Sequence, residues 1–449
     1  MNRNQEILEK ASYPRLLLNL SLPAVVIMLV MVVYNMADTF FIGQTNDPSK
    51  IAAISLCSPM FSILSGLGTL LGSGGCTAIS LALGKKDTET VKRYSSFCCF
   101  AALALGMAFL LSVNLLLAPI CGLLGADADT MADAVRYLRV IALGAPFIMF
   151  NNVFANVIRA DGAARESMIA NCAGTISNIA LDALFILVFS WDVAGAAWAT
   201  VLGNCVSCLY LLYYMTRKQP LLSLSPKQFS LRPEVSWTVV SLGLPMACST
   251  LLMSLSHIIA NRMVIGYGSV ALAAQGVSGK IGMVITMLAM GICMGLQPAI
   301  SYNFGAGNLK RMRQIIRSTA VFTVCLGSVL TILCYLGRNV IISAFIDNEE
   351  VIAYGQVFVF ASIIIGPFYG LYQLCQTFLQ STGKASYASL VALMDKGLFY
   401  LPLLFLLSRT FGLYGIIFTG AATLFLSLAA GIAFSLIWNR KISASAGKR

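Results

Sequence analysis

The chain has 449 residues, of which 58% are hydrophobic and only 11% are charged, and its net charge is +12. An ordinary soluble domain carries about 25% charged residues, and a soluble fold of this length has too little interior to bury so many apolar side chains. Stretches such as 16–34 and 97–120 exceed the ~18 apolar residues that indicate a membrane span. The composition therefore excludes a soluble protein, and these unbroken apolar runs exclude a transmembrane β-barrel, whose strands alternate apolar and polar residues.

Twelve membrane-spanning helices are predicted from the apolar runs and from the turns and charges between them. In chain order, the expected spans are 15–43, 51–83, 94–120, 132–159, 166–190, 194–216, 237–266, 271–303, 314–340, 351–380, 386–408 and 413–439. With the N-terminus inside, 22 of the 30 Lys and Arg residues fall in cytoplasmic segments and five in outer segments. The positive-inside rule thus predicts an all-α, multi-pass protein of the cell membrane with both termini cytoplasmic.

The chain repeats itself at an offset of about 221 residues. Leu22 and Pro23 recur as Leu244 and Pro245, and other pairs follow at nearly the same offset. We therefore expect an N-terminal six-helix bundle (N-lobe, 1–216), a cytoplasmic linker (217–236) and a C-terminal six-helix bundle (C-lobe, 237–449). An even number of spans gives both bundles the same orientation, so they form a parallel repeat about an axis along the membrane normal. This architecture suits alternating access.

Acidic residues inside the spans are the first candidates for function, because a charge at the centre of a span costs about 3 kcal/mol on insertion scales. Asp38 lies in the first predicted span, and Asp182 lies in the fifth with Asn178 one helical turn before it. The side chains of Asn178 and Asp182 therefore share a helix face. Both spans run outward and both acids fall in the outer half, so we expect the two carboxyl groups to converge on one polar site in the N-lobe.

The repeat assigns this acid chemistry to one half of the chain. Between the two copies, Asp38 corresponds to Ala260 or Asn261, and Asp182 corresponds to Leu403. The C-lobe has no carboxylate at either position, whereas a merely structural acid would be expected in both lobes. The alternative is that Asp38 and Asp182 are separately paired or reach toward the membrane surface.

Two coupling ions fit these residues. Desolvation favours the protonated form of a carboxyl group, so a carboxyl group in a span can carry a proton across the membrane. The same oxygens, together with amide oxygens, suit sodium, a hard cation that prefers oxygen ligands. Na+ at Asp38 and Asp182 therefore stays open beside H+, and no other cofactor or metal is expected.

Further polar, aromatic and methionine side chains within the spans are candidates for binding a substrate. They are Tyr34, Asn35, Asn151, Asn152, Phe154, Asn156, His257, Met287, Tyr369 and Gln373. Aromatic rings can stack on a flat organic cation, and methionines can form a deformable wall, although ordinary packing explains a methionine run equally well. His257 is either a proton relay or a hydrogen-bonded core residue, and the second interpretation is favoured.

Two other features have mainly structural interpretations. Pro23 is expected to kink the first span, about four turns before Asp38, which makes this helix a candidate for bending during transport. Asp395 in the eleventh span and Lys280 in the eighth lie at comparable depth, and we expect them to form a structural salt bridge.

These residues resemble the multidrug and toxic compound extrusion (MATE) family over essentially the whole chain. The sharpest match combines Pro23 and Asp38 in the first span, Asn178 and Asp182 in the fifth, and Thr200 in the sixth. In the prokaryotic proton-coupled branch of that family, residues in these places form a cation or proton site in the N-lobe. The resemblance implies an antiporter that expels cationic, amphipathic drugs in exchange for protons or sodium. We expect a monomer in the lipid bilayer and no nucleic-acid partner.

The sequence departs from the branch of the family whose sodium site uses acids in the second half. Here the seventh span offers His257 and the tenth offers Gln373 and Gln376, with no carboxylate on either. Coupling in the N-lobe is therefore favoured.

Two other functional classes fit less well. A flippase for lipid-linked precursors has a related bundle, but such proteins tend to have additional spans and a strongly basic central cavity. An intramembrane enzyme would need a nucleophile with a base, or a cluster of metal ligands, and a single His cannot supply such a cluster. We therefore expect a transporter and not an enzyme.

Overall fold

The computed structural model describes residues 3–43, 47–218, 221–338 and 349–446, and these residues form helices and no strand. Within them, 11 helices are long and apolar enough to cross a membrane. The last of these, Ala385–Ala444, contains a sharp kink at Gly412, whose φ of 59° and ψ of −132° are not helical. Counted as two arms, this segment gives the twelve spans that the sequence predicts.

The helices of the two lobes follow the predicted order. In the N-lobe half they are α1 (Arg3–Lys10), α2 (Tyr13–Leu16), η1 (Leu17–Ser21), α3 (Leu22–Gly43), α4 (Pro48–Gly84), α5 (Thr88–Leu115), α6 (Leu117–Leu123), α7 (Met131–Val157), η2 (Ile158–Asp161), α8 (Ala164–Asp182), η3 (Ala183–Val188) and α9 (Asp192–Lys218). The linker contains η4 (Pro226–Gln228), and the C-lobe has α10 (Pro233–Ile265), α11 (Ser269–Gly305), α12 (Leu309–Leu336), α14 (Glu349–Ile363), α15 (Gly366–Ser381), α16 (Ala385–Leu393), η5 (Met394–Leu398) and α17 (Tyr400–Ala446).

Several helices begin before the apolar runs because polar N-caps set their first turns. Asp47 accepts a hydrogen bond from the Ser49 amide at 3.0 Å before α4, and Asp87 accepts one from the Thr90 amide at 3.0 Å before α5. The hydrogen bonds from Thr90 also lower the pKa of the Asp87 carboxyl group. Asn308 caps α12 in the same way, so this helix begins at Leu309 and not at the predicted residue 314.

Two predicted spans are interrupted. The third span breaks at Leu116, between α5 and α6, and the tenth breaks between Ile363 and Gly366. The second break comes directly before Pro367, which cannot donate a backbone hydrogen bond and fits best in the first turn of a new helix.

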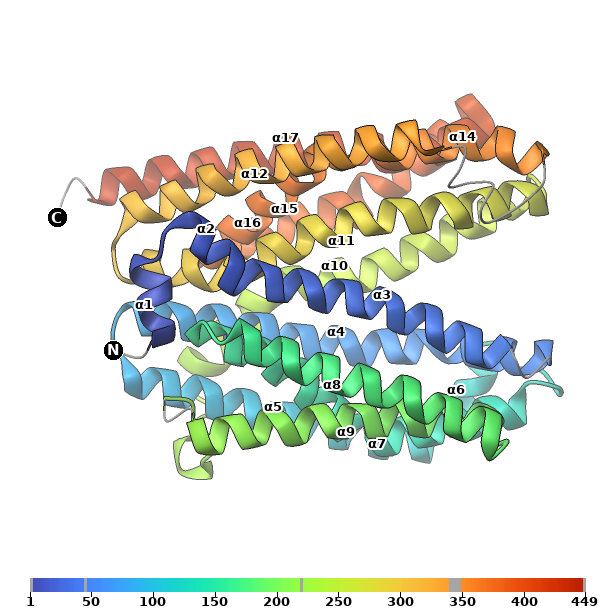
Figure 1. The fold of residues 1–449 in the computed structure, drawn as a ribbon, viewed down its shortest axis with the longest axis horizontal. Helices are drawn as coiled ribbons and strands as arrows, with labels where there is room; N and C mark the ends of the chain where they lie inside the picture. Colours follow the sequence, from blue (N-terminus) through green and yellow to red (C-terminus); the bar gives the residue numbers. More distant parts are fainter. Residues whose placement is uncertain (1–2, 44–46, 219–220, 339–348, 447–449) are drawn as a thin grey trace.

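Both chain ends lie at one end of the long helix bundle (Figure 1), here called the terminal end; the opposite end is the distal end. The two lobes meet near the terminal end at glycines that the repeat relates. A Cβ on Gly84 would lie 2.2 Å from the Tyr302 carbonyl oxygen, and a Cβ on Gly305 would lie 2.3 Å from the Leu81 carbonyl oxygen. The repeat relates Gly84 to Gly305 and Leu81 to Tyr302, so the two contacts are equivalent and the interface between the lobes is symmetric here. The symmetry supports an axis between the lobes that runs along the helices.

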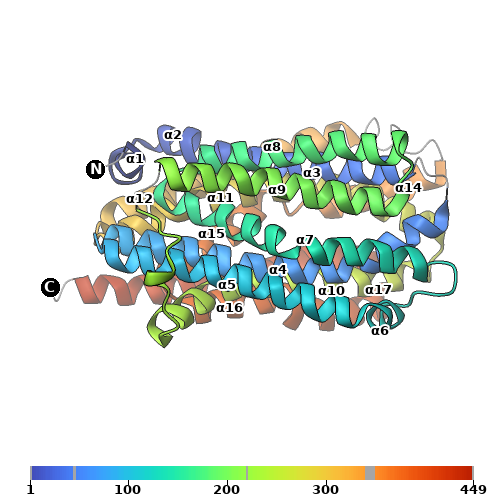
Figure 2. The ribbon, with the colours of Figure 1, turned by 90° about the horizontal axis from the view of Figure 1, so that it is seen from below.

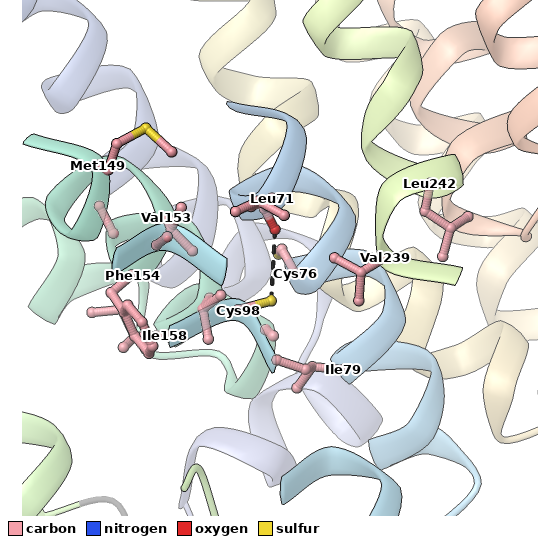
Figure 3. Packing of buried hydrophobic residues seen from close by; sticks show 14 of the residues in the cluster. Leu71, Cys76, Ile79, Cys98, Met149, Val153, Phe154, Ile158, Val239 and Leu242 are labelled. Carbon is pink, nitrogen blue, oxygen red and sulfur yellow. Dashed lines mark hydrogen bonds between the residues drawn. The ribbon is translucent and has the colours of Figure 1, made fainter. Parts of the chain in front are cut away.

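The main hydrophobic core joins the lobes at this end. Figure 3 shows Val239 of α10 on the side turned toward α4, and Leu71, Ile79, Val239 and Leu242 all belong to one buried cluster. Buried polar groups add cross-lobe hydrogen bonds, such as the one from Gln297 Nε2 to Thr77 Oγ1 at 2.8 Å.

Near the distal end, each hydrophobic cluster of the described residues lies within one lobe. Ile186 and Ala196 form a small cluster in the N-lobe, while separate clusters around Val264 and Ile285 belong to the C-lobe. The ribbons of α3 and α11 diverge toward this end in Figure 1, and Figure 2 shows the helices running lengthwise between the two ends. The described residues are therefore joined across the lobes toward the terminal end and parted toward the distal end.

Candidate functional site

A cavity of about 170 Å³ lies within the N-lobe, among α3, α4, α7, α8 and α9. Sites for drug-sized ligands usually measure roughly 300–1,000 Å³, so this cavity suits a hydrated ion or one part of a larger molecule. Its lining is rich in amides and hydroxyls, contributed by Tyr34, Ser65, Asn151, Asn152, Asn171, Thr175, Asn178, Thr200, Asn204 and Ser207.

Two glycines bring the polar faces of α8 and α9 together beside this cavity. A Cβ on Gly174 would lie 2.0 Å from Ser207 Oγ, and a Cβ on Gly203 would lie 2.8 Å from the Asn178 Cβ. Only glycine permits so close a crossing, as is common between membrane helices.

Hydrogen bonds join three of the helices around the cavity. Asn151 Nδ2 on α7 donates to Asn204 Oδ1 on α9 at 2.9 Å, and Asn204 Nδ2 donates to the Thr200 carbonyl at 2.8 Å. The hydroxyls of Thr200 and Tyr34 lie 3.4 Å apart, which brings α3 into the same network. The structure thus places Tyr34, Asn151 and Thr200 together in one polar network.

Asn178 and Asp182 lie on the last turns of α8 and are 3% and 0% exposed. Neither the amide nitrogen nor the amide oxygen of Asn178 has a hydrogen-bond partner among the described residues, although the residue lines the cavity. Asp182 ends α8, and the π-helix η3 follows directly. Single π-turns inside helices are frequent at functional sites, and an unpaired buried amide is available to a ligand.

The side chains of Asn35 and Asp38 lie outside the described part of the structure. The backbone places position 38 one turn beyond Tyr34 on α3, and α3 packs against α8. The convergence of Asp38 with Asp182 stays a prediction.

Phe154 and Asn156 do not line the cavity. Phe154 is fully buried and stacks on Phe150 with ring centroids 4.4 Å apart, so it is a core residue in this structure. Asn156 accepts a hydrogen bond from Arg159 and donates to the Asn152 carbonyl at 2.7 Å. Arg159, at the end of the fourth predicted span, is only 4% exposed.

The other predicted substrate contacts lie in the C-lobe, away from this cavity. Gln373 is buried, Met287 and Tyr369 are half-buried, and His257 is exposed on α10, so the interpretation of His257 as a packed core residue is wrong.

The structure also shows the ion pair of Asp395 and the position of Pro23 in its helix. The ion pair that the structure shows for Asp395 is with its neighbour Lys396 at 2.8 Å, in place of the expected bridge to Lys280. Pro23 is buried and lies two residues after the end of the π-helix η1, which widens the helix just before the proline. A role for this turn in bending stays a prediction.

Several cavity residues did not appear among the candidates, although their spacing could have indicated them. Asn171, Thr175 and Asn178 recur every three or four residues along α8, and Asn204 and Ser207 continue the face of Thr200 on α9. Polar residues at helical spacing inside an apolar span indicate a face turned toward a cavity.

Two six-helix lobes of one orientation, joined toward one end, define a class of polytopic membrane protein with a parallel internal repeat. The family model MatE matches residues 23–184 and again residues 245–406. The two matches begin at Pro23 and Pro245, which are equivalent positions of the predicted repeat. The multidrug export protein MepA of Staphylococcus saprophyticus is 31% identical over 411 residues, covering 92% of this chain and 91% of the relative. MepA of Staphylococcus aureus is 32% identical over 420 residues, with the same coverage.

Solved structures share the fold over the full length of both chains. A MATE protein in complex with MaL6 superimposes with a TM-score of 0.92 at 22% identity. A multidrug resistance MATE family transporter in an outward-facing conformation gives 0.91 at 21% identity. The chain belongs to the MatE family, and the resemblance to MATE transporters is confirmed.

Proposed function

We propose that the protein is a secondary active antiporter that exports cationic, amphipathic compounds in exchange for protons or sodium. The relatives that cover nine-tenths of the chain are named multidrug export proteins, which supports a broad range of small organic substrates. The N-lobe cavity is too small for a whole drug of this kind, so we infer that it takes the coupling ion and one end of the drug.

The observation that carries the proposal is the last turn of α8. Asn178 has an amide without a hydrogen-bond partner among the described residues, and it precedes the fully buried Asp182 by one turn. We infer that Asp38, Asn178, Asp182 and Thr200 form the coupling site. A carboxyl group can release a proton when a cation arrives, and its oxygens with those of the amide and hydroxyl suit sodium equally.

Alternating access would follow from rocking the lobes about their contact near the terminal end. We propose that the terminal end faces the cytoplasm, because exposed basic residues such as Lys85, Lys86, Arg440 and Lys441 lie there. The separation at the distal end would then open the path to the outside. One charge crossing 100 mV supplies about 2.3 kcal/mol, or roughly a fifty-fold concentration ratio for a coupled solute.

Transport of ethidium into vesicles that contain the purified protein tests this function. A proton gradient and a sodium gradient are imposed separately, and one of them is expected to drive dye movement. Uptake that is indifferent to both gradients would contradict antiport.

Asp38→Asn and Asp182→Asn are each expected to abolish gradient-driven exchange, because an amide can neither release a proton nor neutralise a cation. The matched control is Asp129→Asn, which removes an exposed acid outside the spans and should transport normally. Folding is checked by thermal unfolding in detergent. Normal exchange by both site variants would show that coupling does not use the N-lobe acids.

A further inference from the structure

The repeat assigns to the N-lobe cavity an equivalent position in the C-lobe. Gly162 and Gly383 mark turns that are equivalent in the repeat, and both have left-handed φ values, of 85° and 79°. The helices that follow also begin in register, α8 at Ala164 and α16 at Ala385. Positions in α7 and α8 can therefore be compared directly with those in α15, α16 and η5.

In this register, five residues that line the N-lobe cavity correspond to five residues of the C-lobe. Ile148, Asn151, Asn152, Gly174 and Thr175 correspond to Tyr369, Tyr372, Gln373, Asp395 and Lys396, respectively. Where the N-lobe has small residues beside an open space, the C-lobe has an acid and a lysine.

The acid and the lysine bind each other. Asp395 Oδ2 lies 2.8 Å from Lys396 Nζ, and the two side chains are 3% and 26% exposed. Adjacent residues of an α-helix project in different directions, but this pair lies in the π-helix η5. Ser256 Oγ on α10 donates to the Lys396 carbonyl at 2.6 Å and fixes the backbone there.

Aromatic and polar residues of three other elements lie near the pair. Tyr369 and Tyr372 of α15, Tyr400 of α17 and His257 of α10 all lie within electrostatic reach of Asp395 or Lys396. One carboxylate with several aromatic rings is the chemistry by which proteins recognise an amine.

We propose that the C-lobe retains a site for a primary alkylammonium ion and that the side chain of Lys396 fills it as a tethered ligand. Asp395 is then the anionic anchor of this site, and the lysine occupies the place of a free cation. A tethered cation cannot be exchanged, so the C-lobe would take no part in ion coupling. The inference rests on the repeat and on these contacts, and it holds whichever ion the N-lobe uses.

Chemical rescue of Lys396→Ala tests the proposal. The substitution leaves Asp395 as an uncompensated buried charge, which is strongly destabilising, and it removes a segment with the shape of n-propylammonium. We expect the melting temperature of the full-length variant in detergent to fall below that of the unaltered protein. n-Propylammonium should then raise it progressively with concentration, as for any ligand that binds only the folded state. No rise, or the same rise for the unaltered protein, would overturn the proposal.

Controls separate a specific site from a general solvent effect. Propan-1-ol matches the ligand in size without its charge and should not rescue Lys396→Ala. The double variant Asp395→Asn, Lys396→Ala lacks the anchor, and Lys396→Met keeps the space filled, so neither should respond to n-propylammonium. Rescue of either variant would contradict the tethered-ligand assignment. If Lys396→Ala folds only when purified with n-propylammonium, the proposal is supported; if it fails to fold with the amine while Lys396→Met folds, it is overturned.

The outcome is independent of the transport assay. Normal exchange by Asp38→Asn and Asp182→Asn together with rescue of Lys396→Ala would reject the N-lobe coupling site and leave the C-lobe site standing.

Discussion

At the residue scale, the proposed coupling site contains a buried amide that lowers the stability of the fold. A buried polar group without a partner costs about 1–3 kcal/mol, and Asn178 is 3% exposed with both amide atoms unpaired among the described residues. Asn151 is a useful contrast, because its amide nitrogen donates to Asn204 at 2.9 Å across two helices.

Asn178→Leu is expected to keep or raise the free energy of unfolding, by up to about 1 kcal/mol, because an unpaired polar group is replaced by an apolar one of similar size. Gradient-driven efflux should fall about tenfold or more, since a contact to the ion is lost. The matched change Asn151→Leu should instead lower stability. Thermal unfolding and vesicle transport measure both effects, and equal destabilisation by the two variants would indicate a structural partner for Asn178.

Sequence reasoning at this scale identified polar residues within spans but not their neighbours. Tyr34, Asn151 and Thr200, all named as candidates, line one cavity. The ion pair of Asp395 was assigned to the wrong lysine, and the burial of Arg159 was not foreseen. Such details depend on the direction of each side chain and on the helix that packs against it, and neither follows from hydropathy.

At the scale of elements, glycines set how closely the lobes approach. A Cβ on Gly295 of α11 would lie 2.6 Å from the Leu20 carbonyl oxygen and from the Ser21 Cα in η1. Gly279, on the same helix, has nothing within 4 Å of its Cβ position. Replacing either glycine by alanine therefore changes helix propensity equally, but only at Gly295 would the added Cβ clash with a neighbouring element.

Gly295→Ala is expected to destabilise the contact between the lobes by about 1–3 kcal/mol, as overpacking usually does. Gly279→Ala should be neutral or stabilising by up to about 1 kcal/mol, because alanine favours helix. Melting temperatures of the two variants in detergent provide the test. Similar melting temperatures for the two variants would show that η1 and α11 can move apart without loss of stability.

Span order was predictable from apolar runs, but helix boundaries were not. Caps such as Asp87 and Asn308 start helices within polar segments, where hydropathy carries no signal. The break at Leu116 also lies inside an apolar run, whereas the kink at Gly412 falls between the predicted eleventh and twelfth spans.

At the scale of the whole molecule, the repeat predicted the architecture best. Its nearly constant offset anticipated two lobes of one orientation, and the reciprocal contacts of Gly84 and Gly305 agree with it. The sequence could not predict which end is joined, because in the alternating-access mechanism proposed here one sequence would serve both states, with little difference in free energy between them.

The central claim is that drug and coupling ion exchange at the N-lobe acids. Counting the ions released when ethidium binds to the purified protein in weakly buffered detergent tests it most directly. Reciprocal linkage predicts release of about one proton, or one sodium ion, per dye bound. The double variant Asp38→Asn, Asp182→Asn should bind dye without releasing either ion. Release by the double variant equal to that of the unaltered protein, or dye binding by the unaltered protein with no ion released, would contradict the claim.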